Sequence, residues 1–472
     1  MKRNQTYGLD QVNVSFLDIE RSTSLPLVIS PRWNDSLDFL TAWLESNRAW
    51  VDEKLLQYGA VLIRGFQVHT PTDFEKATLA LQPDLCDSYR GTSPRTLVKG
   101  TKYAFSAADV PVNYPIAQHL EMSFLKAPPR HLYFGCMKAS KKPGGETALC
   151  DFRKVYQDIP SELRGRFEAK KIKYTRTHFK VGEKYTYDVG AMLGWPSLFG
   201  TSDKTRVQEI CKEEGAPQVS WIGPNGDTFT QEWYDEPFQR HPITNEPVWF
   251  NHSQVFHWTT FPSELFFAFR RVYDLNLFIH FLLVSLFAVI KYGILGCKMA
   301  LDTTFGDGTP ITFREMVQIR AAIHKNMVFS RWKRGDILAI DNFSVSHGRQ
   351  PTYDKGRKVI VSWSQPHDKT KPIPDASMVS FETSCSSDKN TSTHDSPPKL
   401  VAASPECSFE STLTKAEAQE LKESLLAKHF EKQMADAFSR LECRKRRRNK
   451  RLASCPDLLH SSSDFWKLAT DE

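Results

Sequence analysis

The stretch Gln118-His-Leu-Glu-Met-Ser123 carries the most informative pattern of this chain, a histidine and a carboxylate separated by one residue. In a strand or at its exit, His119 and Glu121 would point to the same side, because residues i and i+2 share a face. Three ligands from one short segment could not close around a metal ion, so a third ligand must come from elsewhere. We assign it to His347, in the run Asp341-Asn-Phe-Ser-Val-Ser-His-Gly-Arg349. Two imidazoles and one carboxylate on one face of iron(II) form the facial triad of non-haem iron sites, which leaves the opposite face open.

The His-x-Glu pair is not specific by itself. The chain has 14 histidines, and a second pair, His429-Phe-Glu431, lies in a stretch with helical periodicity. On a helix those two side chains would point about 200° apart, so we do not expect a metal site there. A single histidine such as His119 or His347 is more often a hydrogen-bonded structural residue. The surrounding motifs therefore have to decide between the two interpretations.

Further motifs accompany the triad in a definite order. They are Gly59-Ala-Val-Leu-Ile-Arg-Gly-Phe66, Pro143-Gly-Gly-Glu-Thr147, Trp249-Phe-Asn251, Gly306-Asp-Gly-Thr-Pro310 and Gly335-Asp-Ile-Leu-Ala-Ile-Asp-Asn342. Through these motifs, residues 25–370 resemble the taurine dioxygenase/clavaminate synthase-like family of iron(II)- and 2-oxoglutarate-dependent oxygenases. The resemblance implies a mainly β core, a double-stranded β-helix (jelly roll) with flanking helices, and a metal held by His119, Glu121 and His347. Glu121 replaces the commoner Asp, which is similar to the clavaminate synthase branch.

The resemblance also implies a binding site for the cosubstrate 2-oxoglutarate. Arg357 stands where the family holds the distal carboxylate, and its planar guanidinium suits that task because it can bind a carboxylate through two parallel hydrogen bonds. Thr147 matches the position whose hydroxyl assists the same cosubstrate. Without the family match, Arg357 would be interpreted as an exposed cation at a strand edge. Arg349 is a weaker candidate for an anion contact, and Lys358 would point to the opposite face of its strand.

The activity implied by the resemblance is that of a dioxygenase that uses Fe(II), 2-oxoglutarate and O2. It would oxidise a C–H bond of a small, polar or carboxylate-bearing substrate and release succinate and CO2. The motifs do not encode the substrate, or whether the outcome is hydroxylation, desaturation or cyclisation. A different class stays open, a non-catalytic oxygenase-fold binding or membrane-associated protein that acts through its tail helix or its apolar segment. His241, His252 and His257 could line a pocket, but we expect structural roles for them.

Short apolar or alternating runs predict the buried strands, and amphipathic runs predict two of the helices. The strands are predicted at Val61–Ile63, His131–Phe134, Ile337–Ile340 and Val359–Trp363, and the helices at Asp73–Leu81 and Ser161–Lys170.

The net charge of +7 comes from one place. The run Arg444-Lys-Arg-Arg-Arg-Asn-Lys-Arg451 holds seven cations, so the remainder of the chain is formally neutral. We therefore expect no nucleic-acid binding through the catalytic domain. The run itself could contact RNA, an import receptor or a membrane surface, or could be the solvated end of a helix. The oligomeric state is not encoded in any pattern that we find.

The composition divides the chain into a domain and its extensions. Residues 1–24 are predicted to be a flexible N-terminus, and residues 371–412, rich in Ser, Thr, Pro and Asp, a disordered linker. Residues 413–452 begin with a capping-box pattern and continue with apolar residues at helical spacing, which predicts an amphipathic helix with a basic end. Residues 453–472 form a short tail.

The nine cysteines show no Cys-x-x-Cys spacing, and their odd number argues against a full disulfide framework. Residues 1–24 also lack the apolar core of a cleavable signal sequence. We expect a cytoplasmic protein, with the nucleus open through the basic run.

One segment does not fit a soluble oxygenase. Residues 275–297 form an almost uncharged apolar insertion that approaches the length of a membrane span. The segment could be a membrane-spanning or membrane-dipping helix, an ordinary buried helix, or a stretch foreign to the mature fold, such as translated intron sequence. A span would separate His119 from His347, so we reject it for an active enzyme and favour an aberrant insertion. A membrane location is expected only if the segment is genuine.

Overall fold

The computed structural model describes residues 7–17, 25–89, 95–108, 110–178, 194–213, 218–222, 226–297 and 299–371. These residues belong to one compact unit. The linker, amphipathic helix and tail predicted from residue 372 onward lie outside the described residues.

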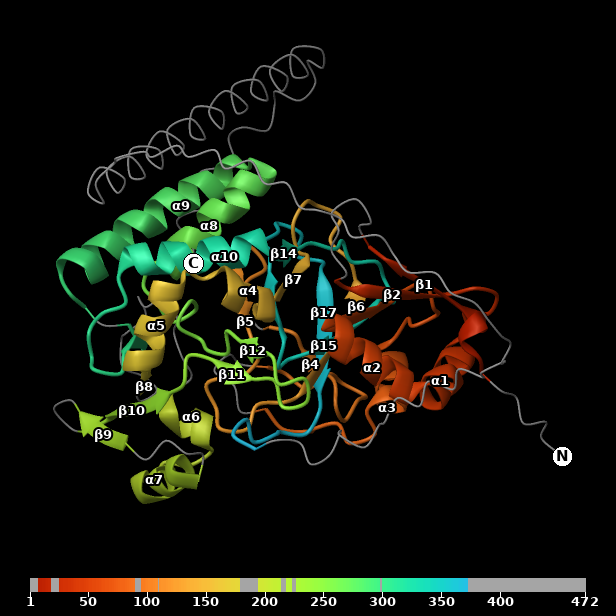
Figure 1. The fold of residues 1–472 in the computed structure, drawn as a ribbon, viewed down its shortest axis with the longest axis horizontal. Helices are drawn as coiled ribbons and strands as arrows, with labels where there is room; N and C mark the ends of the chain where they lie inside the picture. The colour runs from red at the N-terminus through yellow and green to blue at the C-terminus, as the bar shows by residue number, and fades with distance from the viewer. Residues whose placement is uncertain are drawn as a thin grey trace, which may run out of the picture. The chain divides into compact units, whose positions relative to one another are not determined.

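A seven-stranded sheet forms one wall of this unit (Figure 1). Its strands, in spatial order, are β1 (Val12–Phe16), β2 (Leu27–Pro31), β3 (Ala60–Ile63), β15 (Ile337–Asp341), β6 (His131–Lys138), β17 (Lys358–Trp363) and β4 (Phe105–Ser106). All neighbours are antiparallel except β2 and β3. The four strands predicted from apolar runs are confirmed as β3, β6, β15 and β17.

A smaller sheet faces the large one and carries the residues of interest. It consists of β14 (Met327–Val328), β7 (Thr147–Asp151), β16 (Val345–Arg349) and β5 (Ile116–His119). Phe134 and Val361 of the large sheet share one hydrophobic cluster with Leu149 and Val345 of the small sheet. The two sheets therefore pack face to face around a common core, which gives the chain a sheet-rich centre.

Helices cover the outer face of the large sheet. They are α1 (Leu37–Ser46), α2 (Arg48–Tyr58) and α3 (Pro71–Leu81), and their apolar side chains form one cluster with β3 and β15. α3 begins with a capping box between Thr70 and Asp73, with Pro71 in its first turn, which satisfies backbone N–H groups that no helical carbonyl can reach. The predicted helix at Asp73–Leu81 is therefore confirmed.

The segment between β7 and β15 builds a second layer beside the small sheet (Figure 1). Its four-stranded sheet has the order β13 (Leu301–Phe305), β8 (Ile172–His178), β10 (Thr228–Asp235) and β9 (Gln218–Ile222), and β11 (Gln239–Arg240) pairs with β12 (Pro247–Val248). The helices of this segment are α4 (Phe152–Asp158), α5 (Ser161–Lys170), α6 (Trp195–Phe199), α7 (Lys204–Glu213), α8 (Thr260–Val272), α9 (Leu275–Ala288) and α10 (Phe313–Lys325). α5 has the predicted bounds.

The N-terminal prediction needs a correction. Within residues 1–24, which we expected to be flexible, Val12–Phe16 form β1 and pair antiparallel with β2. The Trp43 indole N–H also donates a hydrogen bond to the Gly8 carbonyl at 3.0 Å. Backbone pairing with β2 orders this part of the segment even though it buries few side chains, since only Val12 of the strand is buried.

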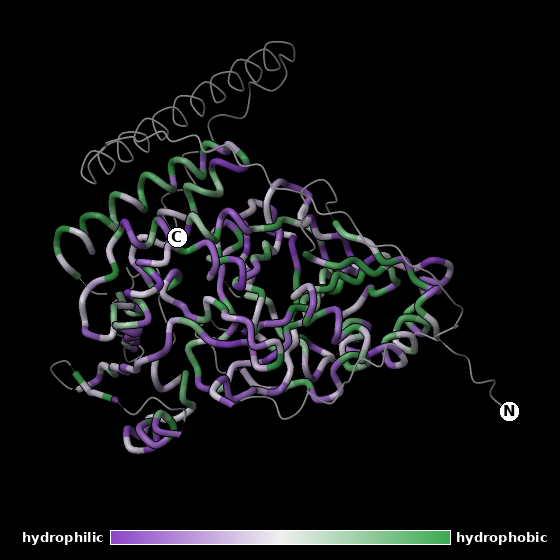
Figure 2. The backbone as a smooth tube through the Cα atoms, viewed as in Figure 1, coloured by the Kyte–Doolittle hydropathy of each residue, from purple (hydrophilic) through white to green (hydrophobic). Residues whose placement is uncertain are grey.

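The apolar segment forms helix α9, continued by a π-helix at Val289–Ile294. It is long and apolar enough to cross a membrane by length and composition, but only 11% of its most apolar window is buried. Figure 2 shows it as a hydrophobic stretch that packs along α8. The alternative of an ordinary buried helix is therefore wrong. The chain before and after α9 belongs to the same domain, because β13, which follows α9, pairs with β8.

Candidate metal centre and active site

Strand pairing brings the two predicted histidine ligands together. β16 and β5 are antiparallel neighbours, and His347 lies directly opposite His119 in their register. Residues opposite each other in such a pair have their Cβ atoms about 5 Å apart, and here the ring centroids are 4.3 Å apart. Gly348 permits the close approach, since a Cβ at this position would lie 2.7 Å from the Ile116 carbonyl oxygen.

Glu121 sits on the turn that follows β5, as the strand-exit interpretation predicted. The Asn342 side chain holds this turn: its Oδ1 accepts from the Glu121 N–H at 2.7 Å, and its Nδ2 donates to the Glu121 carbonyl at 3.0 Å. Met122, the next residue, has a left-handed φ of 55°, a conformation that costs energy and is common at functional sites. The Glu121 Oε2 atom lies 3.7 Å from His119 Nε2 and 3.5 Å from His347 Nε2.

The donor set fits a divalent metal ion. One ligand atom from each of His119, Glu121 and His347 lies within 4.8 Å of the others. The His119 Nδ1–H donates to the Ala117 carbonyl at 2.9 Å, so the lone pair of its other ring nitrogen is directed toward Glu121. Burial, and then the nearby His119, lower the pKa of His347 to about 4, which keeps this imidazole neutral and able to bind a metal at neutral pH.

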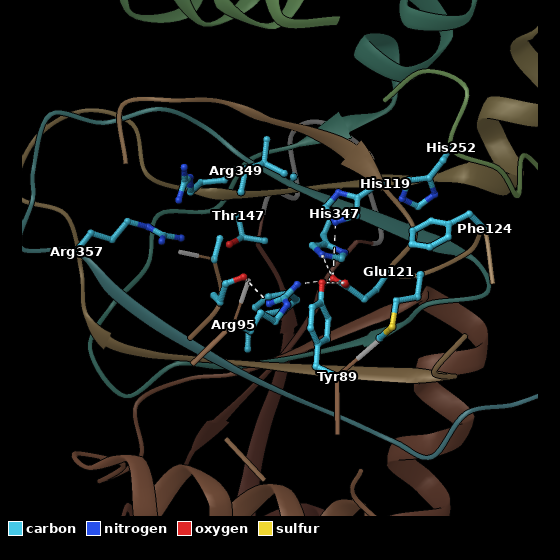
Figure 3. A pocket seen from close by; sticks show the side chains of 16 residues that line it. Tyr89, Arg95, His119, Glu121, Phe124, Thr147, His252, His347, Arg349 and Arg357 are labelled. Atoms are coloured by element: carbon cyan, nitrogen blue, oxygen red, sulfur yellow. Dashed lines mark hydrogen bonds and ion pairs between the residues drawn. The ribbon is translucent and has the colours of Figure 1, made fainter. Parts of the chain in front are cut away.

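Arg95 and Tyr89 surround the Glu121 carboxylate, and the sequence analysis missed both. Arg95 Nη2 donates to Oε2 at 2.7 Å, and the Tyr89 hydroxyl donates to Oε1 at 3.3 Å (Figure 3). Burial alone would raise the pKa of Glu121, but the Arg95 charge and the two histidines hold it well below its usual range. Glu121 is therefore an anion at neutral pH. No spacing in the sequence relates Arg95 to the triad.

The residues predicted to bind the cosubstrate line the same pocket. Arg357, Thr147 and Arg349 form one end of a cavity of about 70 Å3 whose wall also includes the triad (Figure 3). Arg357 donates through Nε to the Gly145 carbonyl at 2.6 Å, and burial lowers its pKa to about 10. Within the described part of the chain no carboxylate forms an ion pair with Arg357. This half-buried cation therefore suits an incoming carboxylate.

Arg349 and Lys358 differ in their surroundings. Arg349 donates to the backbone carbonyls of Val110, Pro111 and Tyr114 at 2.6–3.1 Å, so much of its donor capacity is used within the protein. Lys358 is exposed at the start of β17 and does not line the cavity, in agreement with the prediction that it points to the opposite face of its strand.

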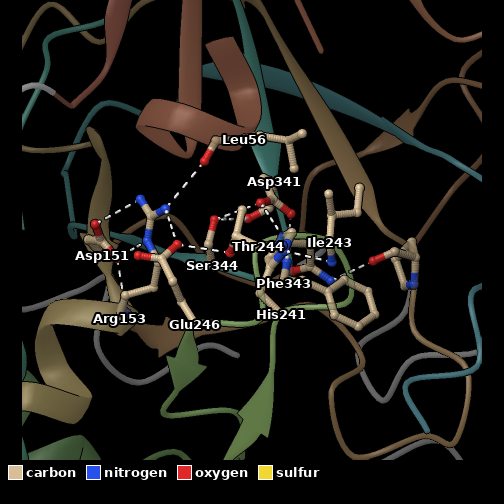
Figure 4. A network of polar contacts seen from close by, with 12 residues as sticks. Leu56, Asp151, Arg153, His241, Ile243, Thr244, Glu246, Asp341, Phe343 and Ser344 are labelled. Atoms are coloured by element: carbon tan, nitrogen blue, oxygen red, sulfur yellow. Dashed lines mark hydrogen bonds and ion pairs between the residues drawn. The ribbon is translucent and has the colours of Figure 1, made fainter. Parts of the chain in front are cut away.

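The three remaining histidines separate into structural and pocket residues. His241 accepts backbone N–H groups at Nδ1 and donates from Nε2 to Asp341 at 2.9 Å, within the polar network of Figure 4. His257 bonds to Thr259 and Ile311. His252, by contrast, lines the cavity and bonds to the Ser123 hydroxyl at 2.7 Å. We expected structural roles for all three histidines, but His252 also lines the pocket.

Comparison with known proteins identifies the class. The sequence profile of the taurine catabolism dioxygenase TauD, TfdA family matches residues 21–363. The chain belongs to this family, and the protein is a non-haem iron, 2-oxoglutarate-dependent dioxygenase.

Two relatives illustrate its neighbours within the family. The dapdiamide synthesis protein DdaC of Enterobacter agglomerans is 27% identical over 317 residues, which cover 67% of this chain and 85% of DdaC. A clavaminate synthase-like protein of Arabidopsis thaliana is 28% identical over 355 residues, which cover 72% of this chain and 94% of that protein.

Solved structures show more distant similarity. PvcB, described as an Fe, alpha-ketoglutarate dependent oxygenase from an isonitrile synthetic pathway, superimposes with a TM-score of 0.41 at 12% identity, over 76% of this chain and 93% of PvcB. AAD-2 in complex with Mn(II) and N-oxalylglycine gives a TM-score of 0.39 at 10% identity, over 77% and 99% of the two chains.

Proposed function

We propose that the protein oxidises a C–H bond of a small polar or carboxylate-bearing molecule with Fe(II), 2-oxoglutarate and O2, and releases succinate and CO2. The observation that carries this proposal is the convergence of His119, Glu121 and His347 in one buried pocket that also exposes Arg357 and Thr147. When bound, iron(II) supplies the redox chemistry by activating O2 at the expense of 2-oxoglutarate.

The residues of the chain have distinct tasks in this proposal. The two imidazoles and Glu121 would hold the metal ion at the wall of the pocket. Arg357 binds the distal carboxylate of 2-oxoglutarate, and Thr147 lies in the pocket wall between the arginine and the metal ligands (Figure 3). The apolar side chains between the two sheets exclude water from behind the site. We infer that these facing sheets are the double-stranded β-helix expected from the family resemblance.

The proposal is tested by succinate formation in the presence of Fe(II), ascorbate, 2-oxoglutarate and O2. We expect the wild type to form succinate and Glu121→Gln to fall to the level measured without iron, because an amide is a poor ligand and carries no charge. His69→Ala is the matched control, since His69 is exposed and distant from the triad in sequence. Equal succinate formation by Glu121→Gln and the wild type would overturn the assignment of the metal ligands.

The cosubstrate assignment has its own test. Arg357→Met should raise the Kd for 2-oxoglutarate by about 10–100-fold, because a hydrogen bond to a charged group contributes roughly 1.5–3 kcal/mol. Arg357→Lys should recover only part of the affinity, since an ammonium cannot form two parallel hydrogen bonds to one carboxylate. Titration of the protein under argon, with the metal present, measures both values. An unchanged Kd in Arg357→Met would contradict the assignment.

A further inference from the structure

Helix α9 and the π-helix that continues it form a long apolar element that the proposed function does not use. The element runs over 20 residues, from Leu275 to Ile294, and no Asp, Glu, Lys or Arg precedes Lys291 in it. At 1.5 Å per residue such a helix is about 30 Å long, as long as the hydrocarbon core of a bilayer is thick. A core helix of a soluble protein can be equally apolar, but only 11% of the most apolar window of this helix is buried. Packing inside the domain therefore does not explain its composition.

The exposed side chains of this helix form one continuous apolar face (Figure 2). They recur at steps of three and four residues, which places them on one side of a helix. His280, the only titratable residue of α9, packs against Tyr114 of the domain, with ring centroids 5.3 Å apart. The face therefore carries no charge along α9. Its large exposed side chains are those of Leu275, Ile279, Leu282, Leu283, Leu286, Val289 and Ile290.

The opposite side of α9 fixes the helix to the domain. Leu277 and Ala288 are buried, and Phe278 packs against Phe269 of α8 with ring centroids 4.9 Å apart. The chain enters α9 from α8 and leaves it toward β13, and both elements belong to the same compact unit. A helix held in this way cannot cross a bilayer, because one domain would then have to lie on both sides of it. It can lie in the plane of a membrane surface with its apolar face toward the lipid.

The two ends of the helix carry residues suited to lipid head groups. Tyr273 precedes α9 and Tyr292 lies in the π-helix, and tyrosine is enriched at membrane–water boundaries because its ring is apolar and its hydroxyl is polar. From Arg270 to Lys291 the chain has three cations and one carboxylate, Asp274, which accepts from backbone N–H groups of α9. Within the described part of the chain no carboxylate forms an ion pair with Arg270, which is exposed. This balance of charge complements an anionic surface.

We propose that the exposed face of α9 binds an anionic lipid surface, with the helix axis parallel to the membrane and the leucine and isoleucine side chains below the head groups. Arg270 and Lys291 contact the anionic head groups at the two ends of the helix. The inference goes beyond the proposed function, since it adds a location for the enzyme and uses none of the residues at the metal site. It also makes residues 275–297 part of the mature protein, which the contact between Phe278 and Phe269 favours.

Co-sedimentation of the full-length protein with lipid vesicles tests the proposal. One set of vesicles consists of phosphatidylcholine alone, and the other contains about one third phosphatidylserine, which is anionic. We expect binding to both sets and tighter binding to the anionic set, because each cation near an anionic surface contributes about 1 kcal/mol, or about fivefold in Kd. Absence of binding to either set would overturn the proposal.

The basic run Arg444–Arg451 could also hold the protein on anionic vesicles, so variants of α9 must separate the two contacts. Leu283→Ser combined with Leu286→Ser should weaken binding to both sets by about tenfold or more, because two leucine side chains no longer enter the lipid. Leu9→Ser combined with Val14→Ser removes two other exposed apolar side chains and is the matched control, which should bind like the wild type. Equal binding by the α9 variant and the wild type would assign the vesicle contact to another region and contradict the proposal.

Arg270→Gln combined with Lys291→Gln tests the charge preference. This variant should bind the anionic vesicles about tenfold or more weakly, and should bind phosphatidylcholine alone like the wild type. High salt should remove only the charge-dependent part of the wild-type binding, because salt screens exposed charges and does not weaken the burial of apolar groups. Unchanged binding of this variant to anionic vesicles, or complete loss of wild-type binding at high salt, would contradict the proposal.

A second copy of the chain is the competing occupant of this face. Sedimentation velocity without lipid measures self-association, and a dimer that depends on α9 but does not bind vesicles would overturn the lipid proposal. The dioxygenase proposal fails separately, because the comparison of succinate formation between the wild type and Glu121→Gln does not involve α9. A thermal melt of each variant shows whether it is folded.

Discussion

At the scale of single residues, the neighbours of Glu121 determine how well its carboxylate can bind a metal ion. Arg95 is buried, with its side chain 6% exposed, and its guanidinium lies 4.8 Å from the centre of the Tyr89 ring. Hydrogen bonds from Arg95 reach both Glu121 and the carbonyl of Ala107. Arg95 thereby holds the carboxylate toward the two imidazoles before any metal arrives.

We predict that Arg95→Met weakens metal binding. Partners that orient a metal ligand typically contribute 10–100-fold in affinity, so the Kd for Fe(II), or for Co(II) as a spectroscopic substitute, should rise by about that factor. Arg95→Lys should recover part of the loss, because it keeps the charge with poorer geometry. Metal titration followed by the absorption of bound Co(II) measures the effect. Equal or tighter binding in Arg95→Met would mean that the arginine competes with the metal and does not position its ligand.

At the scale of secondary-structure elements, the contact between β5 and β16 sets the geometry of the triad. The register shifts between His347 and Arg349, and Gly348 lies at this irregularity with the backbone of β5 against it. The two imidazoles are opposite each other only while the strands keep this distance.

Gly348→Ala is therefore expected to lower both stability and metal affinity. The added methyl group would lie 2.7 Å from the Ile116 carbonyl oxygen, and forcing the strands apart in a packed core costs roughly 1–3 kcal/mol. Urea unfolding and metal titration measure the two effects. Gly165→Ala, in α5 and with no atom near the added methyl, should instead stabilise by up to about 1 kcal/mol. Normal metal binding by Gly348→Ala would show that β5 can shift without moving His119.

Helix α9, in contrast to the packed strands β5 and β16, buries only two of its side chains, Leu277 and Ala288. Leu283 and Leu286 are 62% and 60% exposed, and Leu277 is 2% exposed. Large exposed apolar surfaces commonly mark association sites. The hypothesis that residues 275–297 are an aberrant insertion remains a prediction, and sequencing of transcripts across this segment would test it.

We expect Leu283→Ser combined with Leu286→Ser to reduce self-association while changing the free energy of unfolding by less than about 0.5 kcal/mol. Leu277→Ser is the contrasting variant and should cost roughly 2–5 kcal/mol, because it places a hydroxyl and a void in the contact between α8 and α9. Sedimentation velocity and urea unfolding give the two readouts. A large loss of stability in the double variant would show that another surface covers α9.

At the scale of the whole molecule, buried neutral histidines make the folded domain sensitive to acid. Burial lowers the pKa of His131 to about 4, with a further contribution from Arg130, and burial together with Arg320 does the same for His257. In the unfolded chain a histidine has a pKa of about 6.5. Between about pH 6.5 and 4 the unfolded state therefore binds more protons than the folded state, and stability falls as the pH falls.

The predicted slope is about 1.4 kcal/mol per pH unit for each such histidine. Replacing one of them, as in His131→Gln, should reduce the steepness with which the free energy of unfolding falls between pH 6.5 and 4. Urea unfolding at a series of pH values measures it. Parallel curves for wild type and His131→Gln would show that His131 takes up a proton as readily in the folded state.

The sequence by itself determined the parts of this protein that depend on local spacing. The strands at β3, β6, β15 and β17 follow from short apolar runs, and α3 and α5 follow from their helical patterns. The candidate ligands were recognisable because His119 and Glu121 are two residues apart and His347 stands in a recurrent motif. Alternating apolar residues in Val12–Phe16 were a readable signal for β1 that the sequence analysis did not use.

Only the tertiary structure decided the surroundings of the site. It placed Arg95 on Glu121 and His252 in the wall of the pocket at the triad. It also showed that α9 is exposed, which hydrophobicity alone could not distinguish from burial. These contacts join segments that are far apart in the chain, and they depend on strand register and on how loops cross the sheet. Local periodicity carries no information on either, so the three candidate metal ligands could be picked out from the sequence and their neighbours could not.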